Sequence, residues 1–228
     1  MSGSVGSAPR ALLAEFLGTL LLLAIVVGSG IMGERLADGN AAVALLANAA
    51  ATAGGLYVLV VLFGPLSGAH FNPAVTLVMR MTGERLPAPV FAYVAVQIIA
   101  AIAGVCVAHA MFAEPLWQPG DHIRTGMAQW FSEGVATFGL LLTILLGARY
   151  RPQAIPALVA AYIFAAYWFT ASTSFANPAV TLARAFTQTF AGIRFADVGG
   201  FVIAQMIGAL AAWGVTRALL QSSASGKT

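Results

Sequence analysis

The sequence predicts an all-α membrane protein, built from six transmembrane helices and two short re-entrant helices that form an inverted repeat. The first observation is composition: of 228 residues, 60% are hydrophobic and 8% are charged, which is too little charge to cover a water-soluble globule. The second is a series of apolar runs long enough to cross a bilayer. The third is that Asn-Pro-Ala-Val-Thr-Leu occurs twice, beginning at Asn72 and at Asn177.

Each copy of this motif predicts the start of a short helix. Asparagine is a strong N-cap, and proline, here Pro73 and Pro178, is favoured at the first helical position. Ala74 and Ala179 follow, and each apolar run reaches an arginine after about two turns, whereas a bilayer span needs about 20 apolar residues. We therefore expect two re-entrant half-helices, each entered through irregular backbone that is packed inside the protein.

Six apolar runs give the expected membrane spans. They cover approximately residues 11–32, 42–63, 88–112, 127–147, 155–170 and 196–220. The Gly-Pro-Leu-Ser-Gly stretch at 64–68 is expected to end the second span and to lead into the first half-helix. Residues 1–9 are expected to form a disordered N-terminal tail, and residues 221–228 a C-terminal tail, on either side of one membrane domain at 10–220.

The chain repeats beyond the two motifs. Glu15 and Glu133 begin similar segments in the first and fourth spans, and Gln97 and Gln205 take matching positions in the third and sixth. The two repeats are expected at about residues 10–112 and 127–220. Because each repeat holds three spans, the second must enter the membrane from the opposite side. Basic residues are more frequent in the connections on the side of the termini, which predicts cytoplasmic termini.

Half-helices that enter from opposite faces meet N-terminus to N-terminus near the middle of the membrane. Each terminus carries about half a positive elementary charge, so protons and cations are disfavoured between them. The side-chain amides of Asn72 and Asn177, whose oxygens are used in capping, can donate N–H groups to a neutral solute. Together these features predict a pore for uncharged molecules.

The motifs resemble those of the aquaporin and aquaglyceroporin family, the major intrinsic proteins. The resemblance is carried by residues 14–19, by residues 67–76 and by the tripeptide at Asn177, and it extends over roughly residues 10–220. It implies a right-handed aquaporin-type bundle, with one pore in each subunit of a homotetramer. We accordingly expect a bacterial-type inner membrane protein whose partners are the lipid bilayer and small neutral solutes such as water, glycerol and arsenite, without cofactor, metal or nucleic acid.

The sequence departs from this resemblance at the outer constriction. Water and glycerol channels of the family carry an arginine directly after the second tripeptide, whereas this chain has Val180 there. Arg184 lies one turn farther along and is expected to point elsewhere. Counting back from the asparagines assigns Thr52, Ala165 and Ser174 to the remaining positions of the selectivity filter. All four filter residues are uncharged and small or medium-sized, so a wide filter is expected.

A filter without this arginine resembles that of the aquaglyceroporin branch encoded with bacterial arsenic-resistance genes. The resemblance implies passive conduction of neutral arsenite or related metalloid acids, together with glycerol. The alternatives are a mainly water-conducting aquaporin and, from a different class, an ion-conducting channel. A coupled transporter is disfavoured because the central positions lack paired ionisable groups. An enzyme is disfavoured because no nucleophile, base and orienting group converge in the motifs.

A few further residues with functional chemistry stand inside the predicted membrane domain. Glu15 and Glu133 lie within spans, where a carboxylate is costly unless it has a role or a partner, and the resemblance implies that they hold the re-entrant loops. His70, beside the first tripeptide, is implied to line the inner vestibule. No histidine has a second ligand at metal-binding spacing, and the single cysteine, Cys106, is expected to pack against helices or lipid.

Overall fold

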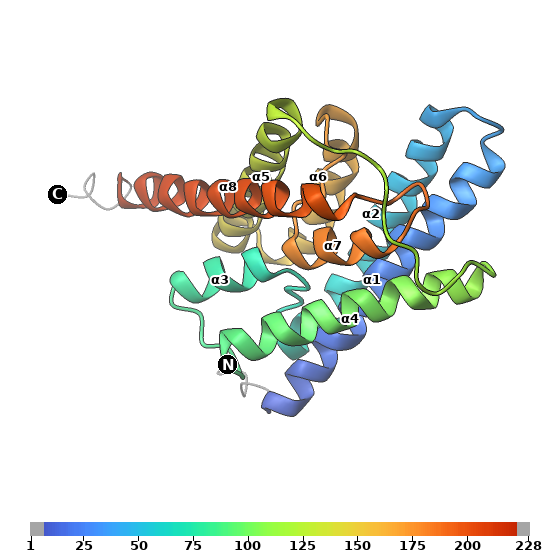
Figure 1. Cartoon of the computed structure of the whole chain (residues 1–228). Coiled ribbons are helices and arrows are strands. Elements are labelled where there is room, and N and C mark those ends of the chain that lie inside the picture. The colour runs from blue at the N-terminus through green and yellow to red at the C-terminus, as the bar shows by residue number, and fades with distance from the viewer. Residues whose placement is uncertain (1–6, 223–228) are drawn as a thin grey trace.

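The structure is a computed structural model that describes residues 7–222. Its long helices are α1 (Ala8–Leu36), α2 (Ala41–Ser67), α4 (Val90–Met111), α5 (Met127–Tyr150), α6 (Ile155–Phe169) and α8 (Phe195–Ser222). Its short helices are α3 (Pro73–Met81) and α7 (Pro178–Ala183), with 3-10 turns η1 (Pro152–Ala154) before α6 and η2 (Arg184–Phe186) after α7 (Figure 1). Within the described residues, six helices are long and apolar enough to cross a membrane. The predicted all-helical fold class is therefore confirmed.

Two helix ends differ from the prediction. Helix α1 includes Ala8 and Pro9, which the sequence assigns to a disordered tail, because proline is favoured in a first helical turn. Most of both predicted tails lies outside the described residues. Helix α2 continues through Pro65 to Ser67, and Gly68 ends it with a φ of 92°. A proline is tolerated in a membrane helix where neighbouring groups satisfy the freed backbone, so the break comes later than the Gly-Pro pair suggests.

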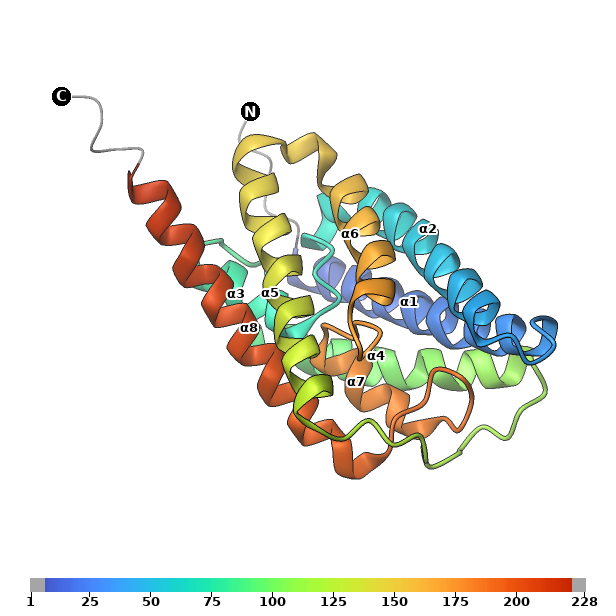
Figure 2. The same cartoon turned by 90° about the horizontal axis from the view of Figure 1, so that it is seen from above.

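The two repeats form matching halves of one bundle. In the first half α1 packs against α2 and α4, and in the second α5 packs against α6 and α8. Helices α2 and α6 join the halves, while α3 and α7 lie between the long helices (Figure 1, Figure 2). Because successive spans alternate in direction, α1 begins and α8 ends on one face of the bundle, here called the terminus face. The connection between α4 and α5 lies at the opposite face, here called the loop face.

Glycines bring the paired helices close together in both halves, although at different positions along them. A Cβ added to Gly104 of α4 would overlap the carbonyl of Leu20 and would lie 2.8 Å from Leu23 Cβ, both in α1. A Cβ added to Gly208 of α8 would overlap the carbonyl of Gly134 in α5. Small residues let membrane helices pack through their backbones. The α1–α4 and α5–α8 contacts therefore tolerate no side chain at these two glycines.

Replacing Gly104 with alanine is expected to destabilise the protein, because the obstructing carbonyl belongs to the backbone and cannot rotate away. Overpacking of this kind costs about 1–3 kcal/mol, which should lower the midpoint of thermal unfolding in detergent. The matched control is Gly54→Ala in α2, where an added Cβ meets no atom within 4 Å and alanine is the better helix former. Equal midpoints for the two variants would contradict the tight α1–α4 contact.

Candidate functional site

Each repeated tripeptide begins a half-helix in the manner that its residues predict. Asn72 Oδ1 accepts a hydrogen bond from the Ala74 N–H at 2.9 Å and so caps α3, with Pro73 in the first turn. Asn177 Oδ1 accepts one from the Ala179 N–H at 3.0 Å and caps α7. An asparagine oxygen that caps a helix leaves the side-chain amide nitrogen available as a donor.

The two asparagines also connect the re-entrant loops to each other. Asn72 Nδ2 donates to the carbonyl of Ala176 at 2.8 Å, and Asn177 Nδ2 donates to the carbonyl of Phe71 at 2.7 Å. Each bond therefore runs from one repeat to the residue directly before the tripeptide of the other. An amide nitrogen carries two hydrogens, so one N–H of each asparagine remains for another acceptor.

The loops before the tripeptides share an unusual backbone. Ala69 and Phe71 have φ values of 50°, and Ser174 and Ala176 have φ values of 52° and 49°. In both repeats these residues stand three and one positions before the asparagine. Non-glycine residues in this left-handed region are uncommon and cost free energy, so the surrounding structure must hold them there.

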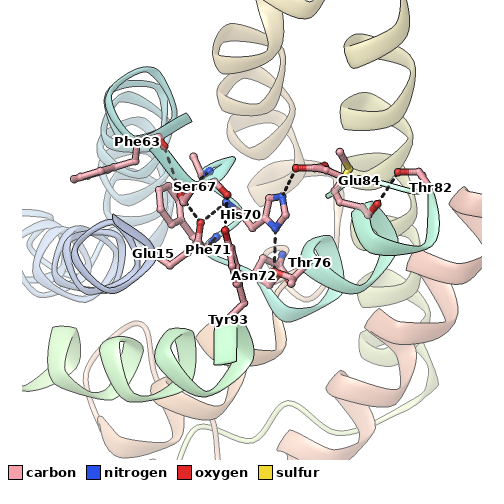
Figure 3. A network of polar contacts seen from close by, with 12 residues as sticks. Glu15, Phe63, Ser67, His70, Phe71, Asn72, Thr76, Thr82, Glu84 and Tyr93 are labelled. Carbon is pink, nitrogen blue, oxygen red and sulfur yellow. Dashed lines mark hydrogen bonds and ion pairs between the residues drawn. The ribbon is translucent and has the colours of Figure 1, made fainter. Parts of the chain in front are cut away.

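Glu15 holds the first loop from within α1 (Figure 3). Its Oε1 accepts hydrogen bonds from Ser67 Oγ at 2.7 Å and from the His70 N–H at 2.9 Å. Its Oε2 accepts from the Phe71 N–H at 2.7 Å and from Gln97 Nε2 at 2.8 Å. The carboxylate is completely buried. One fully satisfied side chain thus joins α1, α2, α4 and the backbone of the first re-entrant loop.

Glu133 makes the equivalent contacts with the second loop. Its Oε1 accepts from the Phe175 N–H at 2.9 Å, and its Oε2 accepts from the Ala176 N–H at 2.9 Å and from Gln205 Nε2 at 2.6 Å. Gln205 Nε2 also donates to Thr181 Oγ1 in α7 at 2.7 Å. The repeated glutamates and glutamines of the sequence therefore lie at equivalent positions around the two loops.

A cavity of about 190 Å³ runs beside the two asparagines. It extends from Glu84, near the terminus face, to Arg184, toward the loop face. Aliphatic side chains of α1, α2, α5 and α6 form much of its wall. Most of the residues predicted for the pore, the filter and the vestibule also line it, namely Thr52, His70, Asn72, Ser174, Asn177 and Val180.

Ala165 is the predicted filter residue that the structure does not bring to this cavity. It is exposed on the outside of α6, whereas Ile163 and Tyr167 of the same helix line the cavity. Tyr167 Oη donates to Thr52 Oγ1 at 3.3 Å. Counting back from Asn177 passes through irregular backbone, and an error of two residues turns a helix by roughly 200°. Sequence reasoning missed Tyr167, because α6 is apolar on all sides and its sequence does not show which side meets the cavity.

Arg184 also differs from its prediction. It does not point away: it is 2% exposed and lines the cavity at its loop-face end. Its Nε donates to the carbonyl of Ala191, and its guanidinium carbon lies 3.4 Å from the centroid of the Phe175 ring. Val180 in α7 stands four residues earlier, and its side chain lines the same cavity. The chain therefore lacks an arginine directly after the tripeptide but has one beside the cavity.

A second arginine supports this end of the cavity from the α4–α5 connection. The guanidinium carbon of Arg124 lies 5.0 Å from the same Phe175 ring. Arg124 Nε donates to the carbonyl of Gly192 at 2.9 Å, and Nη1 donates to that of Ser172 at 3.3 Å. Burial lowers the pKa of the Arg124 guanidinium from its usual value. The loop-face end of the site thus contains two desolvated positive charges on one aromatic ring.

His70 lines the cavity together with Glu84, and Figure 3 shows its polar contacts. Its Nδ1 is 3.2 Å from Thr76 Oγ1, and its Nε2 is 3.6 Å from Glu84 Oε1. The ring also stacks at a tilt on Tyr93, with centroids 5.7 Å apart. The imidazole is therefore held between α3, α4 and the connection that joins them.

Comparison with known proteins agrees with this architecture. A family model described as major intrinsic protein matches residues 4–171. Aquaglyceroporin AqpS of Rhizobium meliloti (strain 1021) is 57% identical over 212 residues, which cover 93% of this chain and 91% of that protein. Probable aquaporin TIP5-1 of Oryza sativa subsp. japonica is 30% identical over 228 residues, covering 92% of this chain and 84% of that protein. The chain therefore belongs to the major intrinsic protein family, and it is a multi-pass membrane channel rather than an enzyme.

Proposed function

We propose that this channel passively conducts small uncharged solutes, with glycerol and neutral arsenite or related metalloid acids as its characteristic permeants. The observation that carries the proposal is the uncharged lining formed by Thr52, Ser174 and Val180. Val180 occupies the position where water and glycerol channels of the family have an arginine. The name aquaglyceroporin of a relative that is 57% identical supports the inclusion of glycerol.

The chemistry of the lining suits a polyhydroxy solute. The re-entrant loops contribute polar side chains, including Asn72, Asn177 and Ser174, while the spans contribute aliphatic ones such as Leu22 and Leu140. Glycerol has hydroxyl groups along one edge and hydrocarbon along the other, so it can hydrogen-bond to the loops while it packs against the spans. Neutral arsenite carries three hydroxyl groups and offers a similar pattern of donors and acceptors.

The charges near the cavity argue against ion conduction. Asn72 and Asn177 are the N-caps of α3 and α7, so both helix N-termini lie beside the cavity. The partial positive charges of these N-termini repel cations. Of the described residues that line the cavity, Glu84 is the only carboxylate, and His70 Nε2 lies 3.6 Å from it. A cation channel would instead present a ring of acidic side chains or carbonyls. The ion-conducting alternative is therefore the weaker one.

A mainly water-conducting channel is the second candidate. It is favoured by the hydrogen bond between Tyr167 Oη and Thr52 Oγ1 at 3.3 Å, which joins α6 to α2 beside the outer part of the cavity. Arg184, at the same end, also takes up space there. If these two side chains set the narrowest point, water would pass and glycerol would not.

Location and assembly follow from the same assignment. We place the terminus face in the cytoplasm of a bacterial-type inner membrane, because basic residues are more frequent in the connections on that face. Each chain contains its own cavity, so a homotetramer would carry four separate pathways. Exposed leucine, isoleucine, valine and phenylalanine side chains on the long helices supply the surface for lipid and for neighbouring subunits.

The deciding experiment is stopped-flow light scattering on proteoliposomes that contain the purified channel. Matched osmotic gradients of glycerol and of neutral arsenite are applied, and water efflux is recorded in the same shrinkage trace. Rapid re-swelling with both solutes, compared with liposomes without protein, is the expected result. Fast shrinkage without re-swelling would contradict the wide filter and would identify a water channel. Shrinkage no faster than that of empty liposomes, without re-swelling, would contradict both the solute channel and the water channel.

A further inference from the structure

We propose that Arg184 determines specificity at the loop-face end of the cavity, where it donates hydrogen bonds to passing solutes and repels cations. This inference rests on the proposed conduction of neutral solutes. It assigns to a residue one turn beyond Val180 the donor and the charge that are missing directly after the second tripeptide. The filter would then combine a small residue at its centre with a positive group at its outer rim.

The first argument is where Arg184 is held. The side chain is 2% exposed to solvent and lines the cavity. Its Nε donates to the Ala191 carbonyl, and its guanidinium carbon lies over the Phe175 ring, 3.4 Å from the ring centroid. A guanidinium stacked on an aromatic ring gains cation–π attraction and loses rotational freedom. The group is therefore positioned before any solute arrives.

The second argument is the set of donors that remains. A guanidinium has five N–H donors, and of the Arg184 nitrogens only Nε donates to another described residue of the chain. Within residues 7–222, Nη1 and Nη2 have no hydrogen-bond acceptor, yet neither is among the fully buried polar atoms without a partner, and the residue lines the cavity. A guanidinium N–H that is removed from bulk water needs an acceptor. An oxygen atom in the cavity, from water or from a hydroxylated solute, is the acceptor that these donors require.

Arg124 shows what an arginine with a structural role looks like in the same place. It approaches the same Phe175 ring, but its Nε and Nη1 donate to the carbonyls of Gly192 and Ser172, and it does not line the cavity. Neither Arg124 nor Arg184 has a described carboxylate within ion-pair distance. Both charges add to the positive potential, but of the two arginines only Arg184 lines the cavity.

The test compares Arg184→Met, Arg184→Gln and Arg184→Lys in proteoliposomes, with Arg35→Met as the control. Arg35 is an exposed arginine at the loop face that pairs with Glu114 and lies outside the cavity. Proton leak is followed with a trapped pH-sensitive dye under a potassium diffusion potential, and glycerol flux by light scattering. Monodisperse elution in detergent establishes that each variant is folded.

Arg184→Met should raise proton leak by at least about tenfold, because a unit charge even about 12 Å from the pathway raises the barrier to a proton by about that factor at an effective dielectric constant of about 20. It should lower glycerol flux by about fivefold, the effect of losing one net hydrogen bond. Arg184→Gln should raise the leak but keep more of the glycerol flux, whereas Arg184→Lys should keep the leak low. Arg35→Met should change neither.

The assignment would be overturned if Arg184→Met and Arg184→Gln both showed the same proton leak and the same glycerol flux as the wild type. If Arg184→Met does not fold, the other two variants still test the assignment, because proton leak should be high in Arg184→Gln and low in Arg184→Lys. Failure of the wild-type channel to conduct arsenite would overturn the proposed solute range but not this inference, because proton leak is measured without any permeant solute.

Discussion

Val180→Arg is expected to reduce glycerol flux by more than about tenfold, an increase of at least about 1.4 kcal/mol in the barrier, while water flux changes little. Val180 is 5% exposed and lines the cavity, so a longer side chain at this position has the cavity as its only space. A solute with three carbons must displace or pass this side chain. Water is small enough to pass beside it.

The new arginine would also meet an existing one. Residues four apart on a helix are neighbours, and like charges at that spacing repel. The introduced guanidinium and that of Arg184 would therefore lie apart and occupy more of the cavity's width. Arg124 adds a third positive charge on the same side. The variant should therefore combine a narrower path with a higher barrier to cations. Glycerol flux should fall measurably, whereas proton leak, which is already low in the wild type, should change little.

Val180→Ile is the matched control, because it adds a single methylene and no charge. Its glycerol flux should stay within about threefold of the wild type, consistent with the small cost of such a change in an apolar pocket. An equal decrease of glycerol flux and water flux in Val180→Arg would show that the whole pathway is blocked. That result would contradict the assignment of residue 180 to the selectivity filter.

Glu15→Ala is expected to be the most destabilising of the substitutions considered, by about 3–5 kcal/mol, the range found when one member of a buried polar network is removed. The carboxylate accepts four hydrogen bonds, two of them from backbone N–H groups at His70 and Phe71. Alanine would leave these donors buried without an acceptor. The loop would then lose what holds Phe71 at its φ of 50°.

Thermal unfolding in detergent and size-exclusion elution measure this effect. Glu15→Gln should unfold at a higher temperature than Glu15→Ala. It should still unfold at a clearly lower temperature than the wild type, because the NH₂ group of glutamine would face N–H donors. Glu34→Ala is the control: Glu34 stands on the same helix but is exposed, and surface substitutions usually change stability by no more than about 0.5 kcal/mol. A midpoint for Glu15→Ala equal to that of Glu34→Ala would contradict the loop-holding role.

Local signals in the sequence determined most of the fold. The tripeptide at Asn72 and its copy at Asn177 each contain the N-cap and the proline that start a helix, and the structure has α3 and α7 at those positions. Apolar runs predicted the six spans because a bilayer imposes a minimum length. The glutamates could be recognised as well, since a carboxylate inside a span needs partners.

The tertiary structure alone decided which side chains border the cavity. Tyr167 lines it in place of Ala165, because the rotation of α6 depends on how the irregular segment before Asn177 folds, and helical periodicity does not pass through such a segment. Arg184 lies beside the cavity because Phe175 and the Ala191 carbonyl, both outside α7, hold its guanidinium there. Sequence thus determined the elements and their caps, which depend on neighbouring residues, whereas the filter depends on contacts between distant segments that only packing brings together.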